Sequence, residues 1–181
     1  MYVTTWLYID CICDSQLNFV PVVRSSDADV TFQSIDKVRF HVYKKDLATF
    51  SGGFPPAELV SSDLEIIDLP ERAVVLDIVF SFTRPQRYPD IHDLKIETLF
   101  ELAEAAEKYE VYNVIILCKT VIRMKTLTYP LQVLRYASRN GYGDLADDAC
   151  PLLLGTPLLD IFELRMPERY LGAWVSRLYE Q

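Results

Sequence analysis

Short segments of alternating apolar and polar residues limit most strongly what this chain can fold into. Residues 30–32 and 38–42 alternate in this way on either side of a short polar turn, which predicts a two-stranded hairpin with one buried face. Residues 65–69 predict a third short strand, which ends at Pro70. A sheet this small cannot bury its apolar face alone, so helices must cover it, and we expect an α+β fold.

The remaining patterning is helical. Residues 44–50 predict a short helix ended by Ser51-Gly52-Gly53, and residues 73–82 are apolar on nearly all sides, as in a buried helix. Two amphipathic helices follow, with apolar faces formed by Ile96, Leu99, Phe100, Ala103, Ala106 and Tyr109, and by Val111, Val114, Ile115, Cys118, Val121 and Ile122.

The first amphipathic helix is expected to begin at Asp93 as N-cap. Its polar face carries Glu97, Glu101, Glu104 and Lys108, and the spacing of the last two predicts an i,i+4 ion pair. A third helix carries Leu131, Leu134 and Ala137 and is capped by Asn140-Gly141, and a fourth begins near Gly143. Further short helical segments are predicted near 158–164 and 168–180.

Composition and charge exclude several classes of function. With 18 basic and 26 acidic residues the formal net charge is −8, so nucleic-acid backbones would be repelled. No apolar run is long enough for a membrane span, and Asp10 and Asp14 interrupt the apolar start, which argues against a signal peptide. We therefore expect an intracellular protein, cytoplasmic or nuclear, with reduced cysteines, of which Cys118 and Cys150 are core residues.

Residues 1–24 are β-prone but irregular, which leaves two alternatives open. They add a strand to this domain or to a neighbouring chain, or they form a loosely held extension.

The search for catalytic or metal-binding residues finds no assembled set. The two histidines, His41 and His92, lack the cysteine spacing of a zinc site, and Cys11-x-Cys13 is a weak metal signal. Asp27, Asp29 and Asp36 cluster near the hairpin, where such residues more often form turns or cap strand edges than act as acid and base. We expect no catalytic, cofactor or metal residues and no cofactor.

Several segments, taken in order, carry a family pattern. They are Asp29-Val30-Thr31-Phe32, then Phe40-x-Val42-Tyr43-Lys44-x-x-Leu47-Ala48-x-x-Ser51-x-x-Phe54, then Ile66-Ile67-Asp68-Leu69-Pro70, then Leu99-Phe100-x-Leu102-Ala103-x-Ala105-Ala106-x-Lys108-Tyr109. Together they resemble the BTB/POZ domain. The tail, Asp144-Leu145-Ala146-Asp147-Asp148-Ala149 with Pro151 and Trp174, is similar to the large fungal (basidiomycete-type) BTB group. Family members usually carry histidine where this chain has Tyr43.

The resemblance implies a small β-sheet capped by a cluster of α-helices over residues 25–125, followed by a helical C-terminal extension over 126–181. It implies a non-catalytic module that binds protein partners, often as a homodimer. Asp29 and Lys44 match the charged pair of dimeric members, and the expected exposed apolar surface includes Val30, Leu47 and Phe50.

The alternative implied by the resemblance is a substrate adaptor for a cullin-based ubiquitin ligase. Its contact would lie around Phe54 and Glu58. Pro56-Ala57-Glu58 is a poor version of the required hydrophobic-x-acidic motif, so self-association is better supported than cullin recruitment.

Overall fold

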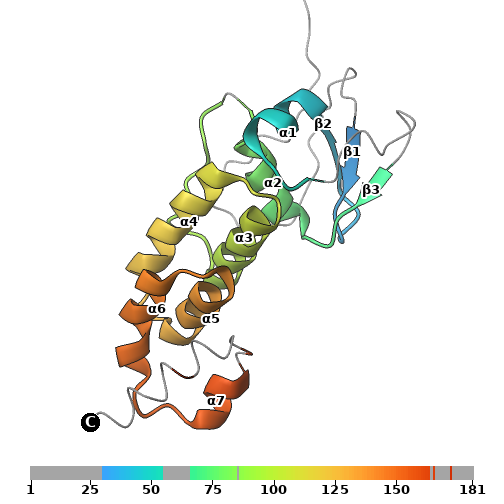
Figure 1. Ribbon diagram of the computed structural model, residues 1–181. Helices are drawn as coiled ribbons and strands as arrows, with labels where there is room; N and C mark the ends of the chain where they lie inside the picture. Colours follow the sequence, from blue (N-terminus) through green and yellow to red (C-terminus); the bar gives the residue numbers. More distant parts are fainter. Residues whose placement is uncertain (1–29, 55–65, 85, 164, 166–171, 173–181) are drawn as a thin grey trace, which may run out of the picture.

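The computed structural model describes residues 30–54, 66–84, 86–163, 165 and 172, and it has mixed α and β structure. Figure 1 shows the sheet at one end of the molecule, α5 and α6 toward the other end, and α3 between them. The elements in chain order are β1 (Val30–Gln33), β2 (Arg39–Val42), α1 (Lys44–Phe50), β3 (Ile66–Asp68), α2 (Ala73–Ser81), α3 (Ile96–Lys108), α4 (Tyr112–Met124), α5 (Pro130–Asn140), α6 (Gly143–Ala149), the 3-10 helix η2 (Cys150–Leu153) and α7 (Leu158–Glu163).

Within the described residues the sheet has the strand order β2-β1-β3. β1 and β2 form the predicted antiparallel hairpin, in which Val30 pairs with Val42 and Phe32 with Phe40. These four side chains are buried, so the predicted apolar face is confirmed. β3 joins the other edge of β1 in parallel, an arrangement that requires a long connection such as the one between β2 and β3.

An aromatic cluster attaches the sheet to the helices. The Phe80 ring of α2 lies 5.4–5.5 Å from the rings of Phe32, Phe40 and Phe54, measured between centroids. α2 is buried from Val75 to Phe80, as its all-round apolar pattern predicts. Ring pairs at this separation add to the energy of burial, so Phe80 is a central contact of this end of the core.

The predicted apolar faces of α3 and α4 are largely confirmed, and the two helices pack against each other. The core continues without a break through α5 and α6 to Leu153 and Ile161. α5 ends as predicted: Gly141 has a left-handed φ of 78°, and its N–H donates to the carbonyl of Ala137. Cys118 and Cys150 are both buried, as expected.

Two local predictions on α3 are wrong. Asp93 is not the N-cap; the cap position is Lys95 and it makes no side-chain cap hydrogen bond. Lys108 does not pair with Glu104. Lys108 instead contacts Glu71 at 2.7 Å, and the Glu71 side chain is only 14% exposed. Glu104 lies 3.8 Å from Arg139. Partners from other elements therefore replace the local pair, because an ion pair on a solvated helix face contributes only a few tenths of a kcal/mol.

No helix among the described residues is both long and apolar enough to span a bilayer.

Candidate functional site

The apolar residues predicted for an exposed interface are mostly core residues. Val30 is 3% exposed and Leu47 is 5% exposed, so the prediction that they form an exposed surface is wrong for this chain. Val30 belongs to the inward face of β1, and Leu47 is the buried residue of α1. Phe50, at the end of α1, is half-buried. The sequence could not distinguish burial in the chain's own core from burial against a partner.

Phe54 also serves the core. Its ring lies parallel to the Tyr109 ring with a centroid distance of 4.2 Å, and it is half-buried. Lys44 begins α1 and already has an interaction partner. Asp29 and Glu58 lie outside the described residues, so the predicted Asp29–Lys44 pair and the predicted cullin contact are untested.

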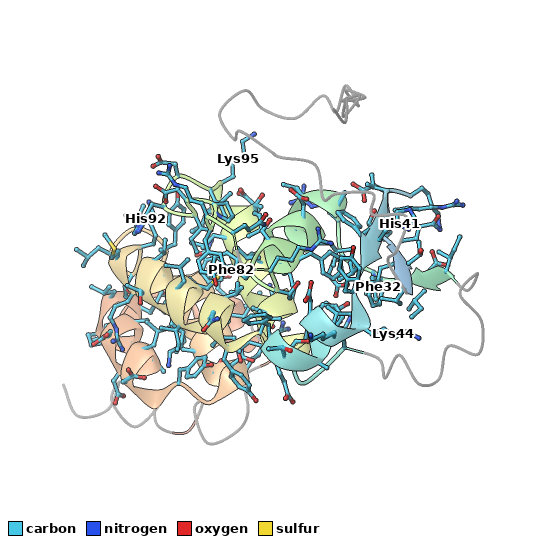
Figure 2. All side chains as sticks on the ribbon, turned by 90° about the horizontal axis from the view of Figure 1, so that it is seen from above. Phe32, His41, Lys44, Phe82, His92 and Lys95 are labelled. Atoms are coloured by element: carbon cyan, nitrogen blue, oxygen red, sulfur yellow. The ribbon has the colours of Figure 1, made fainter. Side chains whose placement is uncertain are left out.

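The residues considered for chemistry lie apart or have structural partners. Figure 2 shows His41 on the sheet and His92 at the opposite end of the molecule. The His41 ring Nδ1 is 2.9 Å from the Thr31 hydroxyl. Asp36 accepts a hydrogen bond from the Ala73 N–H at 2.8 Å, so it caps α2 from the hairpin turn. Across the described part of the chain, no group of three or more His, Cys, Asp or Glu side chains could hold a metal ion.

The outward face of α4 is one candidate contact surface. Tyr112, Ile116 and Met124 are 61%, 66% and 68% exposed, and Leu127 in the following turn is 83% exposed. Tyr112 and Ile116 are four residues apart, and Met124 follows eight residues after Ile116, so these three side chains lie along the solvent side of α4, with the exposed Thr120 between the last two. Together with Leu127 they are here called the α4 stripe. The opposite side of α4 is anchored in the core by Val114, Ile115, Cys118, Val121 and Ile122.

The two cations on α4 face α6. The Lys119 ammonium lies 3.6 Å from the centroid of the Tyr142 ring, and Arg123 pairs with Asp144 and, at 3.2 Å, with Asp148. The sequence of α4 contains no Asp or Glu. Just before α4, Glu110 accepts a hydrogen bond from the Tyr112 hydroxyl at 3.2 Å, so the α4 stripe is an apolar surface with one carboxylate at its N-terminal end.

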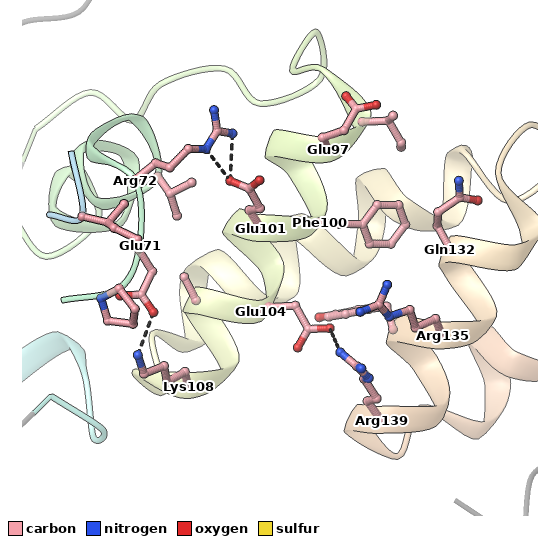
Figure 3. A pocket seen from close by; sticks show the side chains of 16 residues that line it. Glu71, Arg72, Glu97, Phe100, Glu101, Glu104, Lys108, Gln132, Arg135 and Arg139 are labelled. Carbon is pink, nitrogen blue, oxygen red and sulfur yellow. Dashed lines mark hydrogen bonds and ion pairs between the residues drawn. The ribbon is translucent and has the colours of Figure 1, made fainter. Parts of the chain in front are cut away.

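A second candidate surface is an open trough of about 680 Å³ over the polar face of α3. Figure 3 shows α3 along its floor, the segment before α2 on one side and α5 on the other. It is lined by Ile35, Pro70, Glu71, Arg72, Val75, Ile96, Glu97, Phe100, Glu101, Glu104, Ala105, Lys108, Gln132, Arg135, Tyr136 and Arg139.

Ion pairs tie the floor of the trough to both walls. Arg72 contacts Glu101 at 2.8 Å and Lys108 contacts Glu71 at 2.7 Å on one side, and Arg139 lies 3.8 Å from Glu104 on the other. Most of these side chains are about half exposed, so each pair contributes little to stability, although together they fix the positions of the side chains.

Partly buried tyrosine hydroxyl groups add hydrogen bonds between α3 and its neighbours. The Tyr109 hydroxyl donates to Glu71 at 2.5 Å, and the hydroxyls of Tyr136 and Tyr142 both donate to Glu107 at 2.6 Å. Burial, reinforced by the acceptor carboxylate, raises the pKa of all three phenols, so they remain neutral donors. The Glu107 contacts join α3 to α5 and to the residue before α6.

The sequence prediction missed both surfaces. The α4 stripe has a partial signal, because Tyr112, Ile116 and Met124 fall at multiples of four residues outside the predicted apolar face, although Thr120 interrupts the series. The trough has no local signal, because segments near residues 35, 71, 100 and 135 come together only in the fold.

Comparison with known proteins gives no assignment: no protein-family model matches the chain, and a search of curated proteins finds no match.

Proposed function

We propose that this chain is a non-catalytic protein-interaction module of the BTB/POZ type and that the α4 stripe is its main contact surface. The supporting observation is the exposure of three large apolar side chains on the solvent side of α4, whose other side is buried in the core, and of a fourth in the turn that follows. Apolar patches of this kind on folded domains mark protein contacts more often than single exposed apolar residues do.

Charge supports the same surface. Two acidic chains repel each other, and an interface forms most readily where no carboxylates oppose one another. Beyond Glu110 at its N-terminal end, the part of the α4 stripe from Ile116 to Leu127 contains no Asp or Glu, which suits a second copy of this chain and equally an acidic partner.

Charge insertion into the stripe tests the proposal. Ile116→Glu and Met124→Glu are exposed changes, so both variants are expected to fold with an unfolding midpoint close to wild type. If the wild-type chain is a dimer, light scattering after size exclusion is expected to show that both variants are monomers. If the wild-type chain is a monomer, proximity labelling is expected to identify partners that both variants lose.

Leu159→Glu on α7 is the matched control, because Leu159 is 68% exposed and lies outside the stripe. It is expected to keep the wild-type behaviour. A wild-type protein that is strictly monomeric and labels no partner would refute the proposal, as would association that survives both stripe substitutions.

The cullin-adaptor alternative stays a prediction. Phe54 is a poor probe of it, because Phe54→Glu would remove a ring stacked on Tyr109 and disturb the core. Co-purification of the intact chain with a cullin is the direct measurement, and absence of the cullin would remove this alternative.

A further inference from the structure

Separately from the α4 stripe, we propose that the trough over α3 is a docking site for a short peptide segment of a partner protein, in which an apolar residue lies between a basic and an acidic residue. The proposal rests on which groups in the trough remain without partners.

The ion pairs of the trough leave two opposite charges unused. Six of its charged side chains form the pairs that join the floor to the walls. Glu97 on α3 and Arg135 on α5 have no side-chain hydrogen bond or ion pair within the described part of the chain. A ligand that supplies a cation to Glu97 and a carboxylate to Arg135 would form an ion pair with each of these two side chains.

An apolar contact lies between these two charges. Figure 3 shows the Phe100 ring directed toward α5, with Glu97 on one side of it and Arg135 on the other. Phe100 and Ile96 are only half-buried, so a ligand side chain can still remove apolar surface from water there. Gln132 stands opposite the ring and its amide can both donate to and accept from a peptide backbone.

The dimensions fit a short segment of chain. Lining residues of α3 run from Ile96 to Lys108, which at 1.5 Å per residue gives a trough about 18 Å long. A segment of roughly 12 helical residues or 5–6 extended residues spans that length. The mixed charge of the lining favours a peptide with both signs over a purely acidic or purely basic ligand.

Selection from a library of random 12-residue displayed peptides on the full chain tests the proposal. The enriched peptides are expected to share an apolar residue flanked by one acidic and one basic residue. By fluorescence anisotropy, synthetic versions are expected to bind Arg135→Glu and Glu97→Lys about tenfold more weakly than wild type, whereas Arg87→Glu, an exposed control outside the trough, leaves the affinity unchanged.

Charge reversal on the peptide gives the specific check. Replacing the acidic peptide residue by lysine is expected to restore binding to Arg135→Glu and to weaken binding to wild type. If Arg135→Glu fails to fold, Arg135→Gln removes the charge alone and is expected to weaken binding up to about fivefold.

Three outcomes would overturn the proposal: no enrichment over an unrelated protein, equal binding to wild type and both trough variants, or a dimer of this chain that Arg135→Glu dissociates and Ile116→Glu does not. The last outcome would assign the trough to a second copy. Ile116→Glu is expected to bind the peptides normally, so failure of the trough proposal is distinguishable from failure of the α4 stripe.

Discussion

Gly52 and Gly53 are neighbours in the sequence, but their surroundings give them different roles. A Cβ atom on Gly53 would lie 2.5 Å from the Lys108 carbonyl oxygen and 2.9 Å from backbone atoms of Tyr109. The Gly53 N–H also donates to the Tyr109 carbonyl at 3.0 Å. The sequence predicts these glycines only as the end of a helix, whereas Gly53 permits close backbone contact with the end of α3.

We therefore expect Gly53→Ala to lower the free energy of unfolding by roughly 2–3 kcal/mol, because the backbone it meets cannot move aside cheaply. Gly52→Ala is the matched control. Its Cβ would meet the end of the flexible Glu110 side chain, so a change within about 0.5 kcal/mol is expected. Urea unfolding of the two variants makes the comparison, and equal losses would contradict this explanation.

Asp77 is a buried carboxyl group on α2, 9% exposed. Burial raises its pKa to about 7, and the nearby Arg84 guanidinium opposes that shift. Because the folded pKa is above the unfolded value, the native chain binds more protons than the unfolded chain between about pH 4 and 7. Asp77 therefore lowers stability progressively as the pH rises through this range.

Asp77→Asn removes this titration. Relative to the variant, wild type is expected to lose about 2–3 kcal/mol of unfolding free energy between pH 5 and pH 8. Urea unfolding of both proteins at the two pH values measures the difference, independently of any constant effect of the amide. Asp93→Asn, an exposed control, is expected to retain the wild-type pH profile; a pH-independent gap for Asp77→Asn would show that the carboxyl is not perturbed.

Helices of this chain are fixed by contacts from distant elements as much as by their own sequences. α2 has no side-chain cap of its own, and the carboxylate of Asp36, in the β1–β2 turn, accepts from its first N–H. The Ile35 N–H also donates to the Glu71 carbonyl at 3.0 Å, so the hairpin turn and the start of α2 are held together twice.

Asp36→Ala is expected to lower the unfolding free energy by about 1 kcal/mol, the usual cost of losing an N-terminal cap. Asp36→Asn keeps an acceptor oxygen and should lose less than half as much. Chemical denaturation measures both losses. An unchanged slope of the unfolding free energy against denaturant concentration would show that the substitution affects the native state alone. Equal losses in the two variants would assign the effect to charge and not to the hydrogen bond.

The difference between predicted and observed elements has a physical basis. The inward faces of β1, β2, α3 and α4 follow from periodicity, because burial in a single core enforces one apolar face per element. The start of α3 and the partner of Lys108 do not follow from it. Local signals such as Asp93 or the Glu104 spacing are worth only tenths to about 1 kcal/mol. For Lys108, the carboxylate of Glu71 on another element outweighs the local one.

Across the whole molecule, the candidate contact surfaces are the feature that the sequence predicts least well. An apolar pattern identifies residues that are removed from water but not the chain that covers them, so it predicts Val30 and Leu47 equally well for an interface and for the chain's own core, where they lie. The trough depends on four segments meeting in space, which sequence spacing does not encode.

The continuity of the core leads to a prediction about the division at Lys125. Val133, Leu134, Tyr136 and Ala137 of α5 and Leu145 of α6 belong to the same core as α3 and α4. A chain ending at Lys125 would expose the surface that these residues cover and would lose both hydroxyl donors to Glu107. It is expected to lack a cooperative unfolding transition or to aggregate, although it retains the segments that resemble a BTB/POZ domain.

The reactivity of Cys118 measures whether the shortened chain folds. Cys118 is fully buried in the intact chain, and burial raises the pKa of its thiol to about 12. Iodoacetamide labelling at pH 8, mapped by mass spectrometry, is expected to leave Cys118 unmodified in the full chain and to modify it rapidly in the chain ending at Lys125. Protection of Cys118 together with cooperative unfolding in the shortened chain would instead show that residues up to 125 fold alone, and that α5 and α6 pack onto a core already formed.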